Sequence, residues 1–225
     1  TDKMIDLIGD NYSLLQVMSR FGLSLGFGDK TVKEVCEMNN VDCQTFLVVV
    51  NFMAEGFSRM DGSADDISIP ALVDYLRQAH IYFLDYCLPA IRRKLIEAID
   101  CSQDDVSFLI LKFFDGYMRE VRKHMEYEEK TVFKYVDTLI HGNAPKNYQI
   151  STFSKHHDQV GERLTELKNI IIKYCPAKAN TNVLNAALFD IYACEEGLES
   201  HCKVEDYLFV PAILKLERRM RENEK

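Results

Sequence analysis

Four long stretches with apolar residues three or four positions apart limit what this chain can fold into. They cover residues 68–99, 103–139, 150–174 and 180–221. Apolar residues at this spacing lie along one face of an α-helix, and that face has to be buried against another element. Because the connecting segments are short, consecutive helices have to run antiparallel. The sequence therefore predicts an all-α fold built around an up-down four-helix bundle.

Shorter helices are predicted before the bundle. Residues 4–21 are expected to form one helical segment, which a glycine-rich turn brings to an end. Thr31 has the character of an N-cap, and Glu34 follows it by three residues, as in a capping box. Asp42 is expected to cap a further helix that begins at Cys43. This region therefore reads as a small helical domain.

A polar, acidic stretch separates the two helical regions and contains glycine and serine. Such a stretch favours a linker over a continued helix. The predicted division is a small helical N-terminal domain at residues 1–58, a linker at 59–67 and the four-helix bundle at 68–225.

The charge of the chain argues against nucleic acid as a partner. The formal net charge is −8, and residues 1–68 carry 5 Lys and Arg against 11 Asp and Glu, a net charge of −6. A DNA-binding helix-turn-helix at residues 31–58 is disfavoured because phosphate binding needs basic residues. No apolar run approaches the roughly 20 residues of a membrane span. The 7 cysteines contain no Cys-x-x-Cys pair, which is typical of free thiols in a reducing cytoplasm.

Histidine and glutamate occur within the apolar faces of the four long helices. Each face includes one histidine, and two of them include a glutamate four residues later. These residues are His80, His124, Glu128, His157, His201 and Glu205. Side chains four apart lie on the same face of a helix, so each His-x-x-x-Glu pair can reach one point in the core. A buried carboxylate is costly unless it is paired or bound to a metal.

Four imidazoles and two carboxylates suit a pair of metal ions. Two iron ions fit this ligand set, with two nitrogen donors for each ion and two carboxylates to bridge them. Positions remain for an oxo or hydroxo bridge and for a small external ligand. Zinc or manganese stays possible, because ligand type alone does not select iron.

Neighbouring residues offer alternatives to two of these ligands. His156 lies on the polar side of its helix, which favours His157. Asp206 competes with Glu205 but points further round the helix from His201. His141 lies in a loop and is expected to be exposed to solvent. The simplest alternative is a structural bundle in which each histidine is a hydrogen-bonded core residue.

The motifs around these residues resemble the hemerythrin-like HHE cation-binding superfamily, and within it the repair of iron centres family. The matching segments are residues 78–80, 124–129, 157–162 and 201–205, with Phe133 and Leu208. The resemblance implies that the four histidines are imidazole ligands of two irons. It also implies that Glu128 and Glu205 bridge these irons.

Four residues bear on the place of this chain within the superfamily, namely Gly161, Glu120, Gly26 and Phe27. Oxygen-carrying hemerythrins usually have a second histidine four residues after the ligand on the third helix. In this chain that position is Gly161, so the resemblance favours the repair-type site over an oxygen carrier. Glu120, one turn before His124, matches a carboxylate that the family places near the path to the metal. The N-terminal domain of the family carries a cysteine pair where this chain has Gly26 and Phe27.

The resemblance implies a role in nitrosative and oxidative stress. The expected activity is reduction of nitric oxide, supply of iron for the repair of damaged iron–sulfur clusters, or both. Electrons would come from an external donor, and iron–sulfur proteins are possible partners. The alternative is a di-iron sensor that binds oxygen or nitric oxide reversibly and signals through the N-terminal domain. The sequence leaves open whether the protein is an enzyme.

Overall fold

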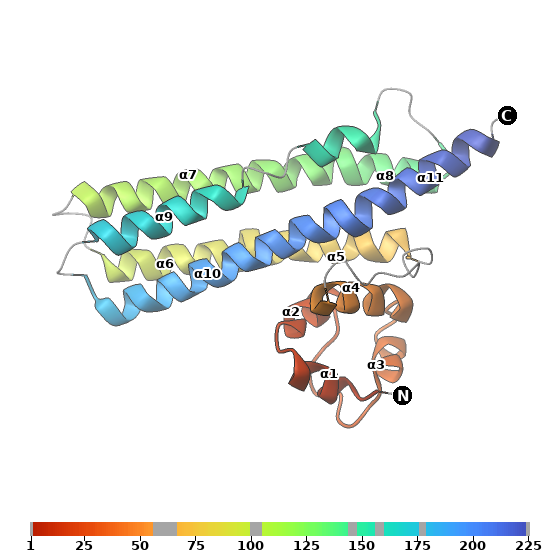
Figure 1. Ribbon diagram of the computed structural model, residues 1–225, viewed down its shortest axis with the longest axis horizontal. Helices are drawn as coiled ribbons and strands as arrows, with labels where there is room; N and C mark the ends of the chain where they lie inside the picture. Colours follow the sequence, from red (N-terminus) through yellow and green to blue (C-terminus); the bar gives the residue numbers. More distant parts are fainter. Residues whose placement is uncertain are drawn as a thin grey trace. The chain divides into compact units, whose positions relative to one another are not determined.

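The regular structure of the chain is helical (Figure 1). The computed structural model describes residues 2–55, 67–99, 105–143, 148–155, 160–175 and 179–223. Within these residues an isolated β-bridge joins Lys3 to Thr31, and no strand forms. The predicted all-α fold is confirmed. None of the described helices combines the length with the apolar character that crossing a membrane requires.

Contacts between Cα atoms divide the chain into two compact units. One contains Thr1–Ala79, Val136–Ser151 and Lys203–Lys225, and the other contains His80–Tyr135 and Thr152–Cys202. The predicted division at residues 58 and 67 follows sequence composition and stays a prediction. All of the predicted linker except Ile67 lies outside the described residues.

The predicted capping residues begin two helices of the N-terminal region, α3 (Val32–Met38) and α4 (Cys43–Glu55). The Thr31 hydroxyl accepts from the backbone N–H of Glu34 at 3.3 Å, and the Glu34 carboxylate accepts from the N–H of Thr31 at 2.8 Å. This capping box lowers the pKa of Glu34 through its hydrogen bonds to the backbone and side chain of Thr31. Asp42 Oδ1 accepts from the N–H of Thr45 at 2.8 Å, so both predicted caps are confirmed.

The expected single helix at residues 4–21 is wrong. Two helices form instead, α1 (Met4–Asp10) and α2 (Leu14–Arg20). Asn11 separates them, because its Oδ1 accepts from the N–H of Ser13 at 3.1 Å and from the Ser13 hydroxyl at 2.6 Å. This local side-chain bonding gives the backbone an alternative to the helix and produces the turn.

Cys36 of α3 provides a test of packing in the N-terminal region. The side chain is buried, and burial together with the neighbouring Cys43 thiol raises the pKa of Cys36 to about 12. Cys36 is therefore expected to resist alkylation by iodoacetamide at pH 8 and to react as the pH approaches 12. An unfolded thiol ionises near pH ~8.5, so the folded state binds more protons between these values and its stability falls as pH rises.

Mass spectrometry of the alkylated peptides would measure this protection. Denatured protein provides the control, since Cys36 and Cys43 should then react at similar rates at pH 8. Rapid alkylation of Cys36 in the folded protein would contradict the buried packing of α3.

Three long helices each run through a π-helical segment without a break (Figure 1). Their parts are α5 (Ile69–Ile81), η3 (Tyr82–Cys87) and α6 (Leu88–Ala98); α7 (Asp105–Tyr127), η4 (Glu128–Val132) and α8 (Phe133–Ile140); and α10 (Thr181–Val204), η7 (Glu205–Phe209) and α11 (Val210–Asn223). The predicted extents at 68–99, 103–139 and 180–221 are confirmed to within two residues. The π-helical segments were not expected from the period of 3.6 residues.

Proline accounts for two of these three segments. Pro89 follows η3 by two residues and Pro211 follows η7 by two residues. A proline inside a helix has no N–H to donate, and its ring crowds the carbonyl four residues earlier. The wider π turn relieves this crowding. No proline follows η4 in this way, and its first residue is the buried Glu128.

The third predicted helix, at residues 150–174, is only partly α-helical where it is described. It consists of a 3-10 helix, η5 (Ile150–Lys155), and an α-helix, α9 (Val160–Tyr174), and residues 156–159 between them lie outside the described residues. The backbone N–H of Ile150 donates to Glu217 Oε1 at 3.0 Å, which holds the first turn in place by a tertiary contact.

In the unit that contains His80–Tyr135 and Thr152–Cys202, the helices α6, α7, α9 and α10 run alongside one another (Figure 1). Their facing sides carry buried apolar residues, namely Leu95, Ile110, Phe114, Leu164, Leu167, Ile171, Ala187 and Ile191. Polar pairs link neighbouring helices at the edges. Arg92 donates from Nε and Nη2 to the Asp115 carboxylate at 2.6 and 3.1 Å and lowers the pKa of Asp115, and Lys94 donates to Asp190 at 2.6 Å.

Candidate metal centre

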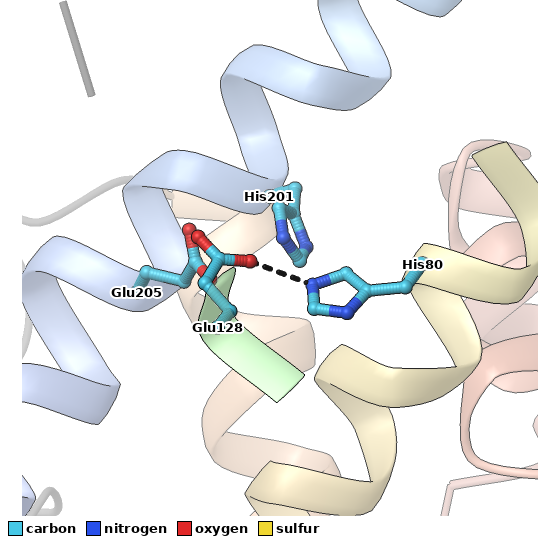
Figure 2. Close-up of side chains that lie close together, drawn as sticks. All are labelled: His80, Glu128, His201 and Glu205. Atoms are coloured by element: carbon cyan, nitrogen blue, oxygen red, sulfur yellow. Dashed lines mark ion pairs between the residues drawn. The ribbon is translucent and has the colours of Figure 1, made fainter. Parts of the chain in front are cut away.

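Four of the predicted ligands come together as a group buried from solvent (Figure 2). One ligand atom from each lies within 4.8 Å of the others, and the residues are His80, Glu128, His201 and Glu205. Their exposed fractions range from 0% to 3%. His80 lies near the end of α5, while His201 and Glu205 lie one turn apart on one continuous helix. The group is a strong candidate for a metal site because it holds two carboxylates away from water.

Glu128 lies between two imidazoles. Its Oε2 is 2.9 Å from His80 Nε2, the contact drawn in Figure 2, and its Oε1 is 2.8 Å from His124 Nε2. The His124 side chain is 14% exposed, more than any of the four members of the group. A carboxylate that directs one oxygen toward each of two imidazoles is placed to bind a cation together with them.

The surroundings of Glu128 keep it ionised. Burial by itself would raise the pKa of Glu128. Hydrogen bonds with His124 and His80, and the charges of His124 and His201, outweigh this effect and lower the pKa well below its usual range. Glu128 is therefore a carboxylate at neutral pH, the form that binds a metal ion.

Both buried glutamates open π-helical segments. Glu128 is the first residue of η4, and Glu205 is the first residue of η7. π turns within α-helices are rare and occur frequently at functional sites. In η4, where no proline follows, the wide turn begins at the residue whose carboxylate faces the imidazoles. In both helices the π-helical segment therefore begins at a glutamate that belongs to the buried group.

The sequence did not reveal the role of Glu129. Its Oε1 lies 2.9 Å from His80 Nδ1, so the imidazole of His80 has a carboxylate at each ring nitrogen. Phe133 stacks on the same ring, with centroids 5.5 Å apart and an interplanar angle of 11°. A carboxylate on Nδ1 fixes the tautomer and directs Nε2 toward the metal position. The signal available was a second glutamate directly after Glu128.

Replacing Glu129 with alanine is expected to weaken metal binding about 10- to 100-fold, because His80 loses the partner that orients its ring. Competition with a calibrated chelator would measure the change in affinity. Glu129→Gln keeps an acceptor oxygen and should recover most of the affinity. The matched control is Glu126→Ala, which removes a half-exposed carboxylate of the same helix that pairs with Lys130. Equal affinities for all four proteins would show that Glu129 does not position His80.

The remaining predicted site residues are placed differently. Glu120 is half-exposed, at 55% for its side chain, and forms an ion pair with Arg163 of α9. His156 and His157 lie outside the described residues, so the choice between them stays a prediction. His141 is exposed, as expected, and its Nδ1 lies 2.8 Å from the carbonyl of Asp137.

Glu205 and Asp206 were the two competing carboxylates at the end of the fourth helix. The group contains Glu205, which is fully buried, and does not contain Asp206, which is half-buried. This difference favours Glu205 as the ligand.

The donor set fits a metal cation. Imidazole nitrogen and carboxylate oxygen together bind iron, zinc and manganese, so the set indicates a metal without selecting one. Within this set the Glu128 carboxylate faces two imidazoles.

Comparison with known families agrees with this geometry. The sequence model of the hemerythrin HHE cation binding domain matches residues 71–213, which include all four members of the group. None of the curated proteins compared with the chain is a match. Since the family match covers more than half of the 225 residues, the chain belongs to the hemerythrin HHE cation-binding domain family.

Proposed function

We propose that this protein is a non-haem di-iron protein that acts in nitrosative and oxidative stress. It reduces nitric oxide, supplies iron for the repair of damaged iron–sulfur clusters, or does both. The observation that carries the proposal is the position of Glu128, whose two oxygens face the imidazoles of His80 and His124 inside a buried group. The resemblance of its motifs to the repair of iron centres family supplies the substrate class.

Six residues hold the two irons in this proposal. They are His80, His124, His157 and His201 as imidazole ligands, and Glu128 and Glu205 as bridging carboxylates. Six ligands leave positions on the two ions for an oxo or hydroxo bridge and for a small molecule. When bound, the iron pair supplies one-electron chemistry and a place where nitric oxide or oxygen binds.

The protein residues fix the ligands and exclude water. His80 is oriented from both sides, by Glu129 at Nδ1 and by the stacked ring of Phe133. Leu198, Leu208 and Phe209 are buried neighbours of the ligands along the same helix. Reduction of two nitric oxide molecules to nitrous oxide and water consumes two electrons and two protons. An external donor provides these electrons, since the sequence carries no flavin or nicotinamide motif.

A reversible sensor is the second candidate. Members of the repair of iron centres family carry a cysteine pair in the N-terminal domain where this chain has Gly26 and Phe27. Thiol chemistry of that pair is therefore not expected for this protein, which favours a sensor. A sensor would bind nitric oxide or oxygen at the same iron pair and would not consume it. The two functions therefore differ in turnover.

The first experiment measures metal content and nitric oxide consumption on the same preparation. Protein purified without oxygen is analysed for iron, zinc and manganese, and then supplied with nitric oxide and a chemical reductant. The proposal expects about two irons per chain. It also expects continuous formation of nitrous oxide, or transfer of iron to a damaged iron–sulfur protein.

The other outcomes separate the candidates. Stoichiometric binding of nitric oxide that reverses under a stream of inert gas would support the sensor. Zinc in place of iron, or stable protein that binds no metal, would overturn both candidates. His157→Ala and His156→Ala, assayed side by side for iron content, identify the ligand on the third helix, and only the first is expected to lose iron.

A further inference from the structure

A second site lies on the bundle between α7 and α9, and its lining on α7 ends at Glu120, one turn before His124. A cavity of about 600 Å³ opens there, formed by residues of these two helices. Its lining on α7 runs from Val106 to Glu120, which corresponds to about 21 Å at 1.5 Å per residue. Cavities of this size hold small organic ligands. The site therefore has the volume and length for an extended molecule.

The two helices line the cavity in antiparallel order. Glu120 of α7 is paired with Arg163 near the start of α9, whereas Val106 and Tyr174 lie at the opposite ends of their helices. The cavity consequently has a polar end at the ion pair. The apolar lining is made by Val106, Leu109, Phe113, Ile170 and Tyr174. Leu109 and Tyr174 are 57% and 64% exposed, so a ligand along this wall would remove large apolar side chains from water.

Gly116 keeps the cavity open. It lies in the middle of α7 and lines the cavity, where a side chain would fill the space. Glycine inside a helix costs about 1 kcal/mol relative to alanine. Packing does not demand this glycine, because the nearest atom to an added Cβ would be Arg119 Nη2, at 3.7 Å. Gly116 therefore destabilises α7, and what it provides in return is open space in the cavity.

The charges beside the cavity are mainly positive, although the chain has a net charge of −8. Lys112 and Arg163 line the cavity, and Arg119 lies beside Gly116. Glu120 is the carboxylate of the lining and is engaged by Arg163. Among the described residues Lys112 forms no ion pair, and the charge of Arg119 acts on the Asp115 carboxylate one turn earlier. An anionic group on a ligand would find the Lys112 ammonium here, together with the unused donors of the Arg163 guanidinium and the positive charge of Arg119 beside them.

We propose that this cavity binds a single-chain amphiphile with a carboxylate head, such as a fatty acid. The alkyl chain lies against Leu109, Phe113 and Ile170. The carboxylate faces the polar end of the cavity, where Lys112 is its main partner and Arg163 and Arg119 contribute further positive charge. Binding involves no covalent step and does not depend on the metal at the ligand group.

The test is a calorimetric titration with dodecanoate at concentrations where it is monomeric. The metal-loaded protein is expected to bind one dodecanoate per chain, and the protein treated with a chelator should bind it equally well. Gly116→Leu fills the cavity and should weaken binding at least about tenfold. Its thermal stability should not fall, because leucine favours the helix more than glycine does.

Head-group variants test the recognition of the carboxylate. Lys112→Glu should weaken dodecanoate binding at least about tenfold and strengthen binding of dodecyltrimethylammonium. Lys123→Glu, an exposed lysine of α7 outside the lining, makes the same charge change and should leave dodecanoate binding unaltered.

Four results would overturn the proposal. These are the absence of saturable dodecanoate binding, unchanged affinity in Gly116→Leu, equal affinity for dodecan-1-ol and dodecanoate, and loss of binding when the metal is removed. The last would place the carboxylate at the metal ligands instead of in the cavity.

Discussion

Replacing Glu128 with alanine is expected to lower iron affinity by at least about 100-fold, more than the loss of a residue that only orients a ligand. The physical reason is that one carboxylate contacts two imidazoles, His80 at 2.9 Å and His124 at 2.8 Å, so a single substitution removes the charged group that both imidazoles face at the candidate metal site. Iron content after reconstitution without oxygen, measured by elemental analysis, checks this expectation.

Two further variants make the result specific. Glu128→Gln preserves the shape of the side chain but removes its charge, and it should also lose most of the iron. Glu126→Ala removes a half-exposed carboxylate two residues earlier and should retain a full complement. If Glu128→Ala folds and keeps its iron, Glu128 is not a bridging ligand and the assignment of the site fails.

Phe133→Ala is expected to destabilise the protein by about 3–5 kcal/mol, because it removes a fully buried aromatic side chain. Phe133 is 1% exposed and stacks on the ring of His80. The substitution should therefore also weaken metal binding, since the imidazole loses one of the groups that hold its orientation. Denaturant unfolding of the metal-free protein gives the first effect, and chelator competition gives the second.

Phe114→Ala separates these two effects. Phe114 is equally buried in α7, and its ring contacts Tyr117, with the centroids 6.3 Å apart. Phe114→Ala should lower the free energy of unfolding by about as much as Phe133→Ala does. The metal affinity of the folded molecules should change little. Equal losses of metal affinity in both variants would mean that Phe133 acts through general stability and does not orient His80.

Helical periodicity predicted the long helices well, because their buried faces are continuous and their ends carry strong signals. Pro70 lies in the first turn of α5, and the predicted start at residue 68 differs from the observed one by one residue. The His-x-x-x-Glu spacing likewise predicted which side chains share a buried face. His80, Glu128, His201 and Glu205 do come together, although they are separated by up to 125 residues along the chain.

Features that depend on tertiary contacts were not predictable in the same way. The 3-10 turn at Ile150 is held by Glu217, far away in the sequence. Glu129 lies one residue beyond the expected buried face, about 100° round an α-helix from Glu128, yet within the π turn of η4 both carboxylates contact His80. The break at Asn11 depends on a side-chain hydrogen bond that competes with the helix.

The π-helical segments have a consequence for how such centres are recognised in other chains. A π turn closes its hydrogen bond over five residues where an α turn uses four, so it contains one extra residue. In this protein the wide turns begin at Glu128 and Glu205, and the four-residue spacing from each histidine survives. In a homologue whose wide turn began between histidine and glutamate, the same spatial arrangement would require a spacing of five. A search for a fixed spacing would overlook that homologue, while an alignment that tolerates a one-residue insertion at this turn would retain it.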